Sequence, residues 1–352
     1  MLDELDQRLI KVASHNISVV IQGPLYRHTS CGGGVNACIT SVKKHLPHAE
    51  IIISTWPSED LSGIDADVIL TSTDPGFLMD YDANRSNINR QIVSTVTGLK
   101  ASKRDYVLKL RADHVLTGSQ FTVMGAYHPS IPKVDRLLNQ PITVSSLFIR
   151  DPTKVPLLFH ISDLAHFGTR EDMITFWDQR LKTQDELFAT QPNMNPIGNF
   201  LGCTAIRRVP EQSLMLGFLA KRCFDIHLKN PSEISPELVT LSENFIAKNF
   251  TVLNWHECQI DFPKRFLKSG HSLKTVYEPK ELKALVELEA HMRKARYRKI
   301  WLNKYLFSFT RLTWWYSLAS ISLTVISPSL AKTARVIMRR IRGLEHPYDD
   351  RA

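Results

Sequence analysis

The stretch Tyr106–Leu116, YVLKLRADHVL, decides how the rest of the chain is interpreted. Side chains alternate between the two faces of a strand, so one face carries Lys109, Arg111 and Asp113 while the other is apolar. Central strands of a parallel sheet are normally apolar on both faces. Charges near the carboxyl end of such a strand therefore need a charged partner or a ligand. A solvated edge strand is the alternative interpretation.

Predicted strands and helices alternate before this stretch. Apolar, β-branched runs predict strands at 16–22, 50–56 and 65–73, and helical patterns at 35–47 and 83–102 separate them. Residues 106–113 then form a fourth strand. This order predicts an α/β fold with a mostly parallel sheet flanked by helices.

Ligands of such sheets bind beyond the carboxyl ends of the strands. The segments expected along that rim are Gln22-Gly23-Pro24, Ser54-Thr55-Trp56, Thr71 to Asp74 and Arg111 to His114.

The second half of the chain is less regular. We expect a strand at 142–151, a helix from about Thr169, a helix from Pro210 and a short helix capped by Ser242. A long charged helix is expected at about 277–304. We therefore divide the chain into a domain at 1–276 and a helical extension with a basic tail at 277–352.

Composition and cysteine usage are those of a globular intracellular protein. The chain has 352 residues, of which 43% are hydrophobic and 22% charged, enough for one large core or two ordinary ones. Its five cysteines are scattered, so neither a disulfide framework nor a zinc site is indicated. The first residues, MLDELDQRLIKVASHN, lack the features of a signal peptide. We expect a cytoplasmic protein.

The positive charge is concentrated near the C-terminus. Residues 291–343 contain twelve Lys and Arg and no Asp or Glu, whereas the whole chain has a net charge of +9. The uncharged run 312–331 holds five serines, two threonines and a proline, too polar for a confident membrane span. Aromatic residues beside cations are typical of an element on an anionic membrane surface. The tail thus predicts peripheral attachment to the inner face of the cytoplasmic membrane. A helical tail packed on the body is the alternative, and no nucleic-acid partner is expected.

Several polar side chains are candidates for a site. Asn87 and Arg90 lie at the start of a predicted helix, where an anion is favoured, although ordinary capping explains the pattern as well. The glycine-rich loop CGGGVN, 31–36, fits no phosphate-binding motif and is expected to be a flexible turn. His160 and Asp163 suit a loop that lines a polar substrate. The acids Asp172, Glu211 and Glu243 are catalytic candidates that equally suit helix N-terminal turns.

Eight of these segments, taken in order, resemble the WavE-type lipopolysaccharide biosynthesis family. The resemblance extends from about Ile17 to Glu211, more weakly to about Phe250, and leaves the tail from about 290 outside. The segments are ISVVIQGPL, HLPHAEIIISTW, STDPG, NINRQIVSTVTGLK, YVLKLRADHVL, SLFIRDP, FHISDLAHFGTREDM and VPEQ.

That family is similar to glycosyltransferases of the GT-A type, which the resemblance implies for this chain. In the GT-A pattern, a D-x-D after the fourth strand holds a divalent metal on the diphosphate of a sugar nucleotide. Here the same place contains Arg111-Ala112-Asp113, so a cation replaces the first acid. Two alternatives stay open. Asp113 holds Mg²⁺ or Mn²⁺, or Arg111 supplies the positive charge without a metal.

The resemblance implies transfer of a sugar from a nucleotide-sugar donor to a lipopolysaccharide core or a related lipid-linked surface glycan. Glu211 is the first candidate for the catalytic base, followed by Asp172 and Glu243, while His160 and Asp163 are assigned to the acceptor. The alternative functions are a sugar nucleotidyltransferase and an inactive glycan-binding relative. The predicted donor-binding residues are Gln22, Gly23, Pro24, Thr71, Asp74, Asn87, Arg90, Arg111 and Asp113, and the predicted metal ligand is Asp113.

Overall fold

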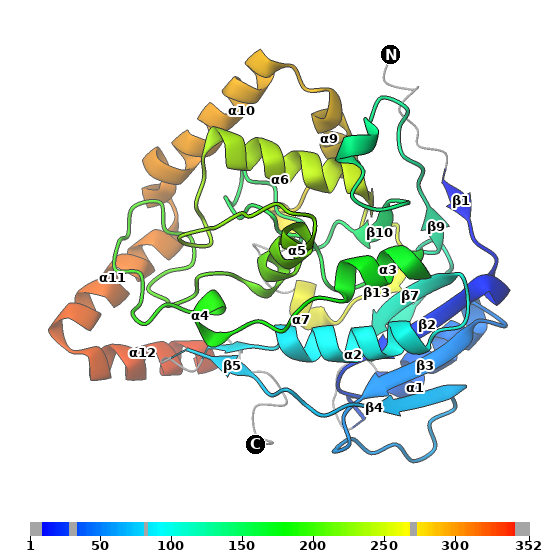
Figure 1. Ribbon diagram of the computed structural model, residues 1–352. Helices are drawn as coiled ribbons and strands as arrows, with labels where there is room; N and C mark the ends of the chain where they lie inside the picture. Colours follow the sequence, from blue (N-terminus) through cyan, green and yellow to red (C-terminus); the bar gives the residue numbers. More distant parts are fainter. Residues whose placement is uncertain (1–8, 28–33, 81–83, 268–272, 342–352) are drawn as a thin grey trace.

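The computed structural model describes residues 9–27, 34–80, 84–267 and 273–341, shown in Figure 1. Seven of its strands form one sheet, and the other six pair into short two-stranded ribbons. The strands are β1 (Ile10–Lys11), β2 (Ile17–Gln22), β3 (Glu50–Thr55), β4 (Val68–Thr71), β5 (Leu78–Met79), β6 (Arg85–Ser86), β7 (Tyr106–Arg111), β8 (Val115–Leu116), β9 (Val123–Met124), β10 (Ile142–Ser145), β11 (His166–Thr169), β12 (Phe250–Leu253) and β13 (Ile260–Asp261).

The sheet is mixed but mostly parallel. Its strand order is β12-β10-β11-β7-β2-β3-β4, and β11 alone runs antiparallel to its neighbours. The expected parallel arrangement of β2, β3, β4 and β7 is confirmed. Because β7 lies in the middle of the sheet, between β2 and β11, the alternative of a solvated edge strand is excluded.

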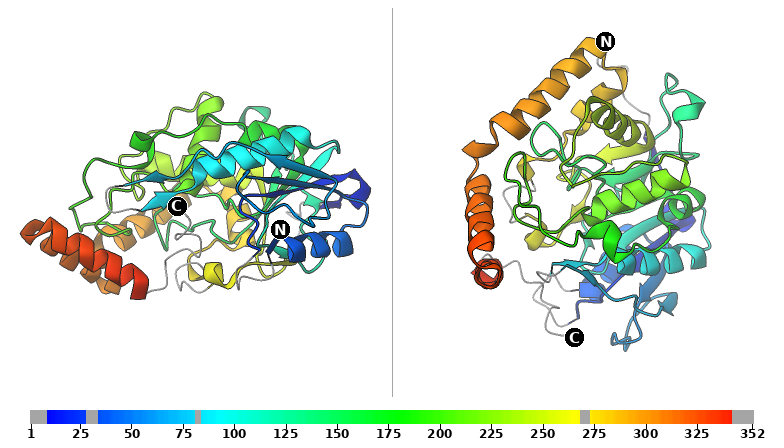
Figure 2. Two further views of the ribbon diagram at one scale, coloured as in Figure 1. Left: turned by 90° about the horizontal axis from the view of Figure 1, so that it is seen from below. Right: turned by 60° about the vertical axis from the view of Figure 1, so that its left-hand side comes forward.

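Helices cover both faces of the sheet (Figures 1 and 2). α1 packs on one face through Val35, Cys38 and Val42, and α2 packs on the other through Ile88, Ile92 and Leu99. The α-helices are α1 (Gly34–His45), α2 (Ile88–Ala101), α3 (Arg170–Trp177), α4 (Gln184–Leu187), α5 (Pro210–Lys221), α6 (Pro236–Asn249), α7 (Lys264–Leu267), α9 (Pro279–Ala284), α10 (Ala290–Trp301), α11 (Leu312–Ile326) and α12 (Pro328–Ile341).

The alternation predicted for β7 explains why one of its faces is apolar and the other carries Lys109. Leu108 and Leu110 join the core beneath α1, whereas Lys109 lies fully buried on the opposite face. The Lys109 ammonium donates to the carbonyl oxygens of Asp163 and Leu164 and lies 4.8 Å from the Trp177 ring centroid. Burial lowers the pKa of Lys109 to about 7. This side chain therefore ties β7 to the loop before β11.

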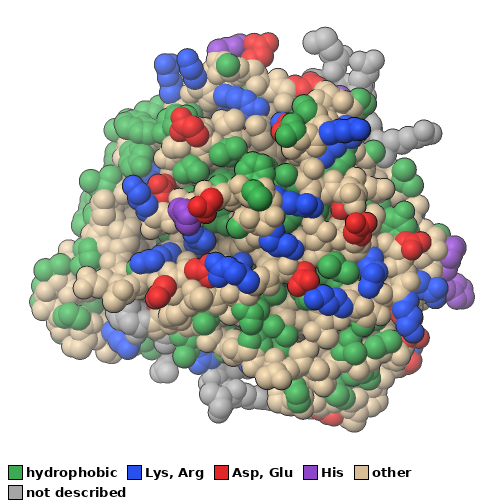
Figure 3. Space-filling model, in the orientation of Figure 1, with side chains coloured by type: hydrophobic (Ala, Val, Ile, Leu, Met, Phe, Trp, Pro, Cys, Tyr) green, Lys and Arg blue, Asp and Glu red, His purple; other side chains and the backbone are tan. Residues whose placement is uncertain are grey.

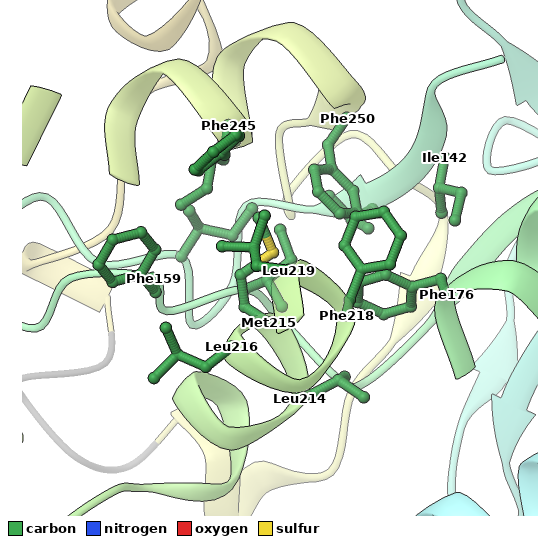
Figure 4. Close-up of a cluster of buried hydrophobic side chains, with 14 of the residues drawn as sticks. Ile142, Phe159, Phe176, Leu214, Met215, Leu216, Phe218, Leu219, Phe245 and Phe250 are labelled. Carbon is green, nitrogen blue, oxygen red and sulfur yellow. The ribbon is translucent and has the colours of Figure 1, made fainter. Parts of the chain in front are cut away.

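A second core forms between α3, α5 and α6 (Figure 4). Phe218 and Phe250 both contact Phe176, with ring centroids 5.1 and 5.5 Å from that of Phe176. Met215 and Phe245 join the same buried cluster. This packing fixes the axis of α5, whose first turn carries Glu211.

The C-terminal helices begin as part of the body and end at its edge. Leu282 and Leu285, from α9 and the 3₁₀ turn η4 (Leu285–Glu287), and Ile300 of α10 are buried in the same core as α5 and α6. After α10, the π-helical turn η5 (Leu302–Leu306) and the turn η6 (Ser308–Thr310) lead to α11 and α12, which line one edge of the molecule in Figure 2. Among the described residues, no helix combines the length and apolar character needed to cross a bilayer.

Three local predictions were wrong. The strand expected at 142–151 ends at Ser145, and the following residues form a loop at the rim of the sheet. The helix expected to start at Ser242 begins at Pro236, where the Ser235 hydroxyl accepts from the Leu238 N–H. The long helix expected at 277–304 is divided into α9, η4 and α10. Of the loop predicted at 31–36, residues 31–33 lie outside the described residues, and residues 34–36 are the first turn of α1 and not a flexible turn.

Candidate active site

The carboxyl ends of β2, β3, β4 and β7 meet at one edge of the sheet. In the register of the sheet, Gln22 of β2 is paired with Arg111 of β7, and Thr55 of β3 with Thr71 of β4. β10 is parallel to β7, so the loop after Ser145 reaches the same edge. The antiparallel β11 starts there, and this places the preceding residues 160–165 at the rim as well.

The rim includes a topological switch point. The chain leaves β2 towards β3 and crosses back to β7 on the other side of β2, with α1 and α2 on opposite faces. Loops at such a point diverge and leave a crevice that receives ligands in open α/β sheets. Gly23 and Asp113 follow the two strands that flank this crevice. The candidate site is therefore expected between the ends of β2 and β7.

Asp113 lies between two guanidinium groups, and we call Arg111, Asp113 and Arg265 the arginine cluster. Arg111 donates to both oxygens of Asp113, at 3.1 and 3.3 Å, and Arg265 of α7 donates to one of them. The Asp113 side chain is fully buried, whereas those of Arg111 and Arg265 are 11% and 23% exposed. The cluster has one more cation than anion and presents its cations towards the outside.

Aromatic rings hold the two arginines in place. The Tyr26 hydroxyl accepts from Arg111 at 2.9 Å, and Arg265 lies 5.3 Å from the Tyr26 ring centroid. Phe266 contacts both guanidinium groups, with centroid distances of 5.3 and 4.7 Å. Tyr26 has a φ of +55°, which is strained for a residue with a side chain. Strain of this kind is maintained where the surrounding packing dictates it, as at binding sites.

A third arginine lies at the rim in the first turn of α2. Arg90 donates to both carboxylate oxygens of Asp74, and its guanidinium lies 3.8 Å from the Phe77 ring centroid. Burial disfavours the charged carboxylate, but the hydrogen bonds from Arg90 and from the Gly76 N–H outweigh this and lower the pKa of Asp74. The predicted donor residues Asp74 and Arg90 thus form an ion pair with each other.

The other predicted donor residues also lie at the rim. Gln22 accepts from the Ser94 hydroxyl at 2.7 Å, and the carbonyl of Gly23 accepts from Thr55. Gly23 has a φ of +91°, a conformation that glycine adopts without strain. Asn87 is the N-cap residue of α2 and accepts from the Gln91 amide at 3.1 Å. Pro24 follows Gly23, and Thr71 ends β4.

Two predicted acids and a histidine gather beside the arginine cluster. We call Glu211, Asp163, His160 and Arg150 the acidic cluster. Burial and then the nearby Asp163 carboxylate raise the pKa of Glu211 to about 8, although Arg150 opposes the shift. Glu211 therefore holds a proton over most of the neutral range.

His160 is a neutral partner of Glu211. Burial lowers the pKa of His160 to about 3, and Arg150 adds to the decrease. Its Nδ1 lies 2.5 Å from the Phe148 carbonyl oxygen, which requires Nδ1 to carry the proton. The Nε2 is then an acceptor, 3.7 Å from Glu211 Oε2. At this distance the two groups are near but not hydrogen-bonded, and the proton of the pair lies on Glu211.

Two phenylalanine rings connect the clusters. Phe148 and Phe266 make an edge-to-face contact with centroids 5.7 Å apart. Arg150 lies 5.0 Å from the Phe148 centroid, just as Arg111 contacts Phe266. Phe148 has a φ of +72°, the second strained residue at this rim. The arginine cluster and the acidic cluster thus lie on either side of one aromatic pair.

The structure does not bring Asp172 to this rim, and it places Glu243 in an ion-pair network with Arg296, which also binds Asp151, the residue after Arg150. Asp172 follows Thr169, which pairs with Tyr106 at the opposite end of β7, and its carboxylate accepts from the backbone N–H groups of Asn139 and Gln140. Glu243 lies in the middle of α6 and is bound by Arg296 at 2.7 Å and by the Tyr277 hydroxyl at 2.8 Å. Asp172 and Glu243 thus stabilise the fold through these hydrogen bonds.

Five residues of the site were missed at the level of sequence: Tyr26, Phe148, Arg150, Arg265 and Phe266. The segment FPKRF, 262–266, does have a signal, because it places two cations between aromatic residues. Nothing local connects it to Asp113, which is 152 residues away from Arg265 along the chain.

The surroundings of Asp113 do not fit a divalent metal ion. Both of its oxygens accept from guanidinium groups, so an ion bound there would lie against two cations. Within the part of the chain that the structure describes, no three His, Cys, Asp or Glu side chains form a possible metal-binding group. The open alternative of Mg²⁺ or Mn²⁺ at Asp113 thus finds no support in the geometry.

Comparison with known proteins places the chain in a family. The family described as WavE lipopolysaccharide synthesis matches residues 17–335. A search among curated proteins found no match. The family match includes α10, α11 and most of α12, so the expectation that the tail from about 290 lies outside the family was wrong. The chain belongs to the WavE lipopolysaccharide synthesis family.

Proposed function

We propose that the protein transfers a sugar from a nucleotide-sugar donor to a lipopolysaccharide core or a related lipid-linked surface glycan. The family connects the chain with lipopolysaccharide synthesis. The arginine cluster at the switch point is the observation that carries the more specific reaction, because an excess of positive charge there suits the diphosphate of such a donor. We also propose the GT-A type for the sheet, on the basis of its four adjacent parallel strands β7-β2-β3-β4 and this rim.

The arginine cluster takes the role that a metal ion has in the D-x-D pattern. The bond between the anomeric carbon and the donor diphosphate breaks with its electrons moving to the phosphate oxygen. Arg111 and Arg265 stabilise this developing charge, which is where fixed positive charge accelerates the step. Asp113 orients the two guanidinium groups and keeps them apart.

Glu211 accepts the proton of the acceptor hydroxyl as that oxygen attacks the anomeric carbon. A base is most effective when its pKa lies near the working pH, and the pKa of Glu211 is raised to about 8. His160 lies beside the carboxyl with its Nε2, and Asp163 lines the acceptor side. A direct displacement of this kind inverts the anomeric centre.

The first test measures the melting temperatures of the unmodified protein and of Asp113→Asn. Each protein is mixed with UDP, GDP or CMP, in the presence of either Mn²⁺ or EDTA. Removing the negative charge leaves both arginines and raises the net positive charge of the cluster. We expect a nucleotide-selective stabilisation that persists in the variant and in EDTA, with a lower melting temperature of the variant alone. Asp65→Asn, which removes an exposed partner of Lys43, serves as the control.

Loss of the shift in both Asp113→Asn and EDTA would instead support a metal-bound donor. Absence of a shift with every nucleotide, in a folded protein, would remove the proposed donor site. Donor binding without transfer to any lipopolysaccharide acceptor would favour an inactive glycan-binding relative.

A further inference from the structure

The exposed apolar side chains are concentrated in the C-terminal helices. Of the 23 large hydrophobic residues that are exposed in the described chain, fifteen lie between 292 and 338. Leu312, Val325 and Ile326 are each more than 70% exposed. Figure 3 shows hydrophobic side chains along the left-hand edge, the place of α10 and α11 in Figure 1. An apolar surface of this extent indicates a binding surface.

α11 has an inner and an outer face. Ser317 and Ile321 are buried, and Thr324 lies 3.8 Å from the Cys203 thiol in the body. The outward positions Leu312, Trp315, Tyr316, Ala319, Ser322 and Ile326 follow the helical spacing of one face, and all are exposed. The outer face is therefore the one available to a partner.

α12 packs on α11 and adds to this surface. Ala331 is buried, and Arg335 donates to Ser320 at 3.3 Å and to Thr324 at 2.9 Å, which commits this cation to the helix pair. Leu330 and Ile337, two helical turns apart, are exposed. The two helices thus form an apolar hairpin at the edge of the molecule.

Cations flank the apolar surface. On α10, Lys294, Arg298 and Lys299 are exposed, whereas Arg293 and Arg296 bind groups of the body. The further exposed cation Lys332 lies on α12. Aromatic and aliphatic side chains beside cations, with no acid from 291 to 343, complement an anionic lipid surface.

This surface adjoins the acidic cluster. Asn303 donates to the carbonyl oxygens of Thr153 and Lys154, and Arg311 donates to the carbonyl of Lys154. Thr153 and Lys154 belong to the turn that directly follows Arg150 at the rim. The turn thus connects the apolar edge to the part of the rim that carries Glu211 and His160.

We propose that η5, η6 and the outer faces of α11 and α12 form a docking surface for an anionic lipid bilayer. The apolar side chains enter the headgroup region, and Lys294, Arg298, Lys299 and Lys332 bind lipid phosphates. The helices lie along the bilayer and do not cross it. Docking turns the acceptor side of the rim towards the membrane. Only this orientation rests on the proposed function.

The test is co-sedimentation of the full chain with phosphatidylcholine vesicles, with and without phosphatidylglycerol. We expect binding that needs phosphatidylglycerol and weakens with salt. The triple variant Leu312→Ser, Ile326→Ser, Leu330→Ser changes only strongly exposed positions and should lose binding. The triple variant Lys294→Glu, Arg298→Glu, Lys332→Glu should bind about a hundredfold less, since each surface cation contributes about fivefold.

A matched control replaces exposed apolar residues of the body: Ile10→Ser, Ile69→Ser and Val134→Ser. It should bind vesicles like the unmodified protein, and light scattering should give the same mass for all variants. No sedimentation of the unmodified chain, or equal binding by the apolar and control variants, would overturn the proposal. A dimer that only the Leu312, Ile326, Leu330 variant dissociates, without vesicle binding, would show a self-association surface instead.

Discussion

The arginine cluster and the acidic cluster lie at the same rim, but their charges are balanced in opposite ways. Asp113 is faced by two guanidinium groups, whereas Glu211 has one cation, Arg150, and a second carboxylate, Asp163, in its surroundings. The Asp113 side chain is fully buried, and that of Glu211 is 17% exposed. The greater burial of Asp113 is thus accompanied by more neighbouring cations, and it is the number of cations that separates the two clusters.

This difference in charge suggests that the two clusters have different roles in the reaction. A cluster with excess cation attracts an anion and gains from charge that develops on a leaving group. A buried acid beside another acid keeps its proton to higher pH and is suited to exchange one. The rings of Phe148 and Phe266 contact each other and lie between the two clusters. The predictions below separate the two roles.

The largest effect is expected for Glu211→Gln. The amide has nearly the same size but cannot take a proton, so kcat/KM of sugar transfer should fall by about 10² to 10⁴. Binding of the donor nucleotide in the thermal shift should not change. The rate of the unmodified enzyme should rise with pH up to about 8, where Glu211 becomes ionised.

Glu243→Gln is the matched control, because Glu243 is also a buried glutamate but lies in the network with Arg296 and Tyr277. It should lower stability while leaving the rate per folded molecule unchanged. A loss of rate as large as that of Glu211→Gln would show that the acidic cluster is not the source of the base.

A smaller effect is expected for Arg265→Ala, which removes one of the two cations facing Asp113. The excess charge of the cluster disappears, and affinity for the nucleoside diphosphate should fall by about 10- to 100-fold, in line with about 1.5–3 kcal/mol for a charged hydrogen bond. Titration calorimetry measures this change. Arg180→Ala, at an exposed pair with Glu186, should have no effect, and an unchanged affinity in Arg265→Ala would contradict the role of the cluster.

The sequence predicted what depends on local pattern. Alternation in β7 and the order of strands and helices were sufficient for the sheet and for the rim that carries Arg111 and Asp113, whereas Glu211 was chosen through the resemblance of VPEQ to the family. Partners that meet only in three dimensions could not be predicted. Arg265 reaches Asp113 from a distant helix, and the loop at Phe148 was predicted to be a strand because its residues are apolar.

Helix starts were the other source of error. Glu243 was expected in a first helical turn because Ser242 resembles an N-cap, but the helix starts at the Ser235-Pro236 pair. Ser242 instead accepts from the Phe159 N–H within the body. Asp172 was correctly placed in a first helical turn, although the direction of β11, which puts that turn at the opposite end of the sheet, has no local signal.

The smallest effect is a change in the pH dependence of stability. The pKa of Glu211 in the folded protein is about 8, above the value of about 4.3 for an unfolded glutamate, so the native state holds an extra proton between these pH values. Stability therefore falls as pH rises through this window, by at most about 1.4 kcal/mol per pH unit from this group. Urea unfolding at pH 6 and 7 should show a smaller decrease in Glu211→Gln than in the unmodified protein. Equal slopes would mean that Glu211 is already ionised in the native state, and the contrast between the two clusters would then be lost.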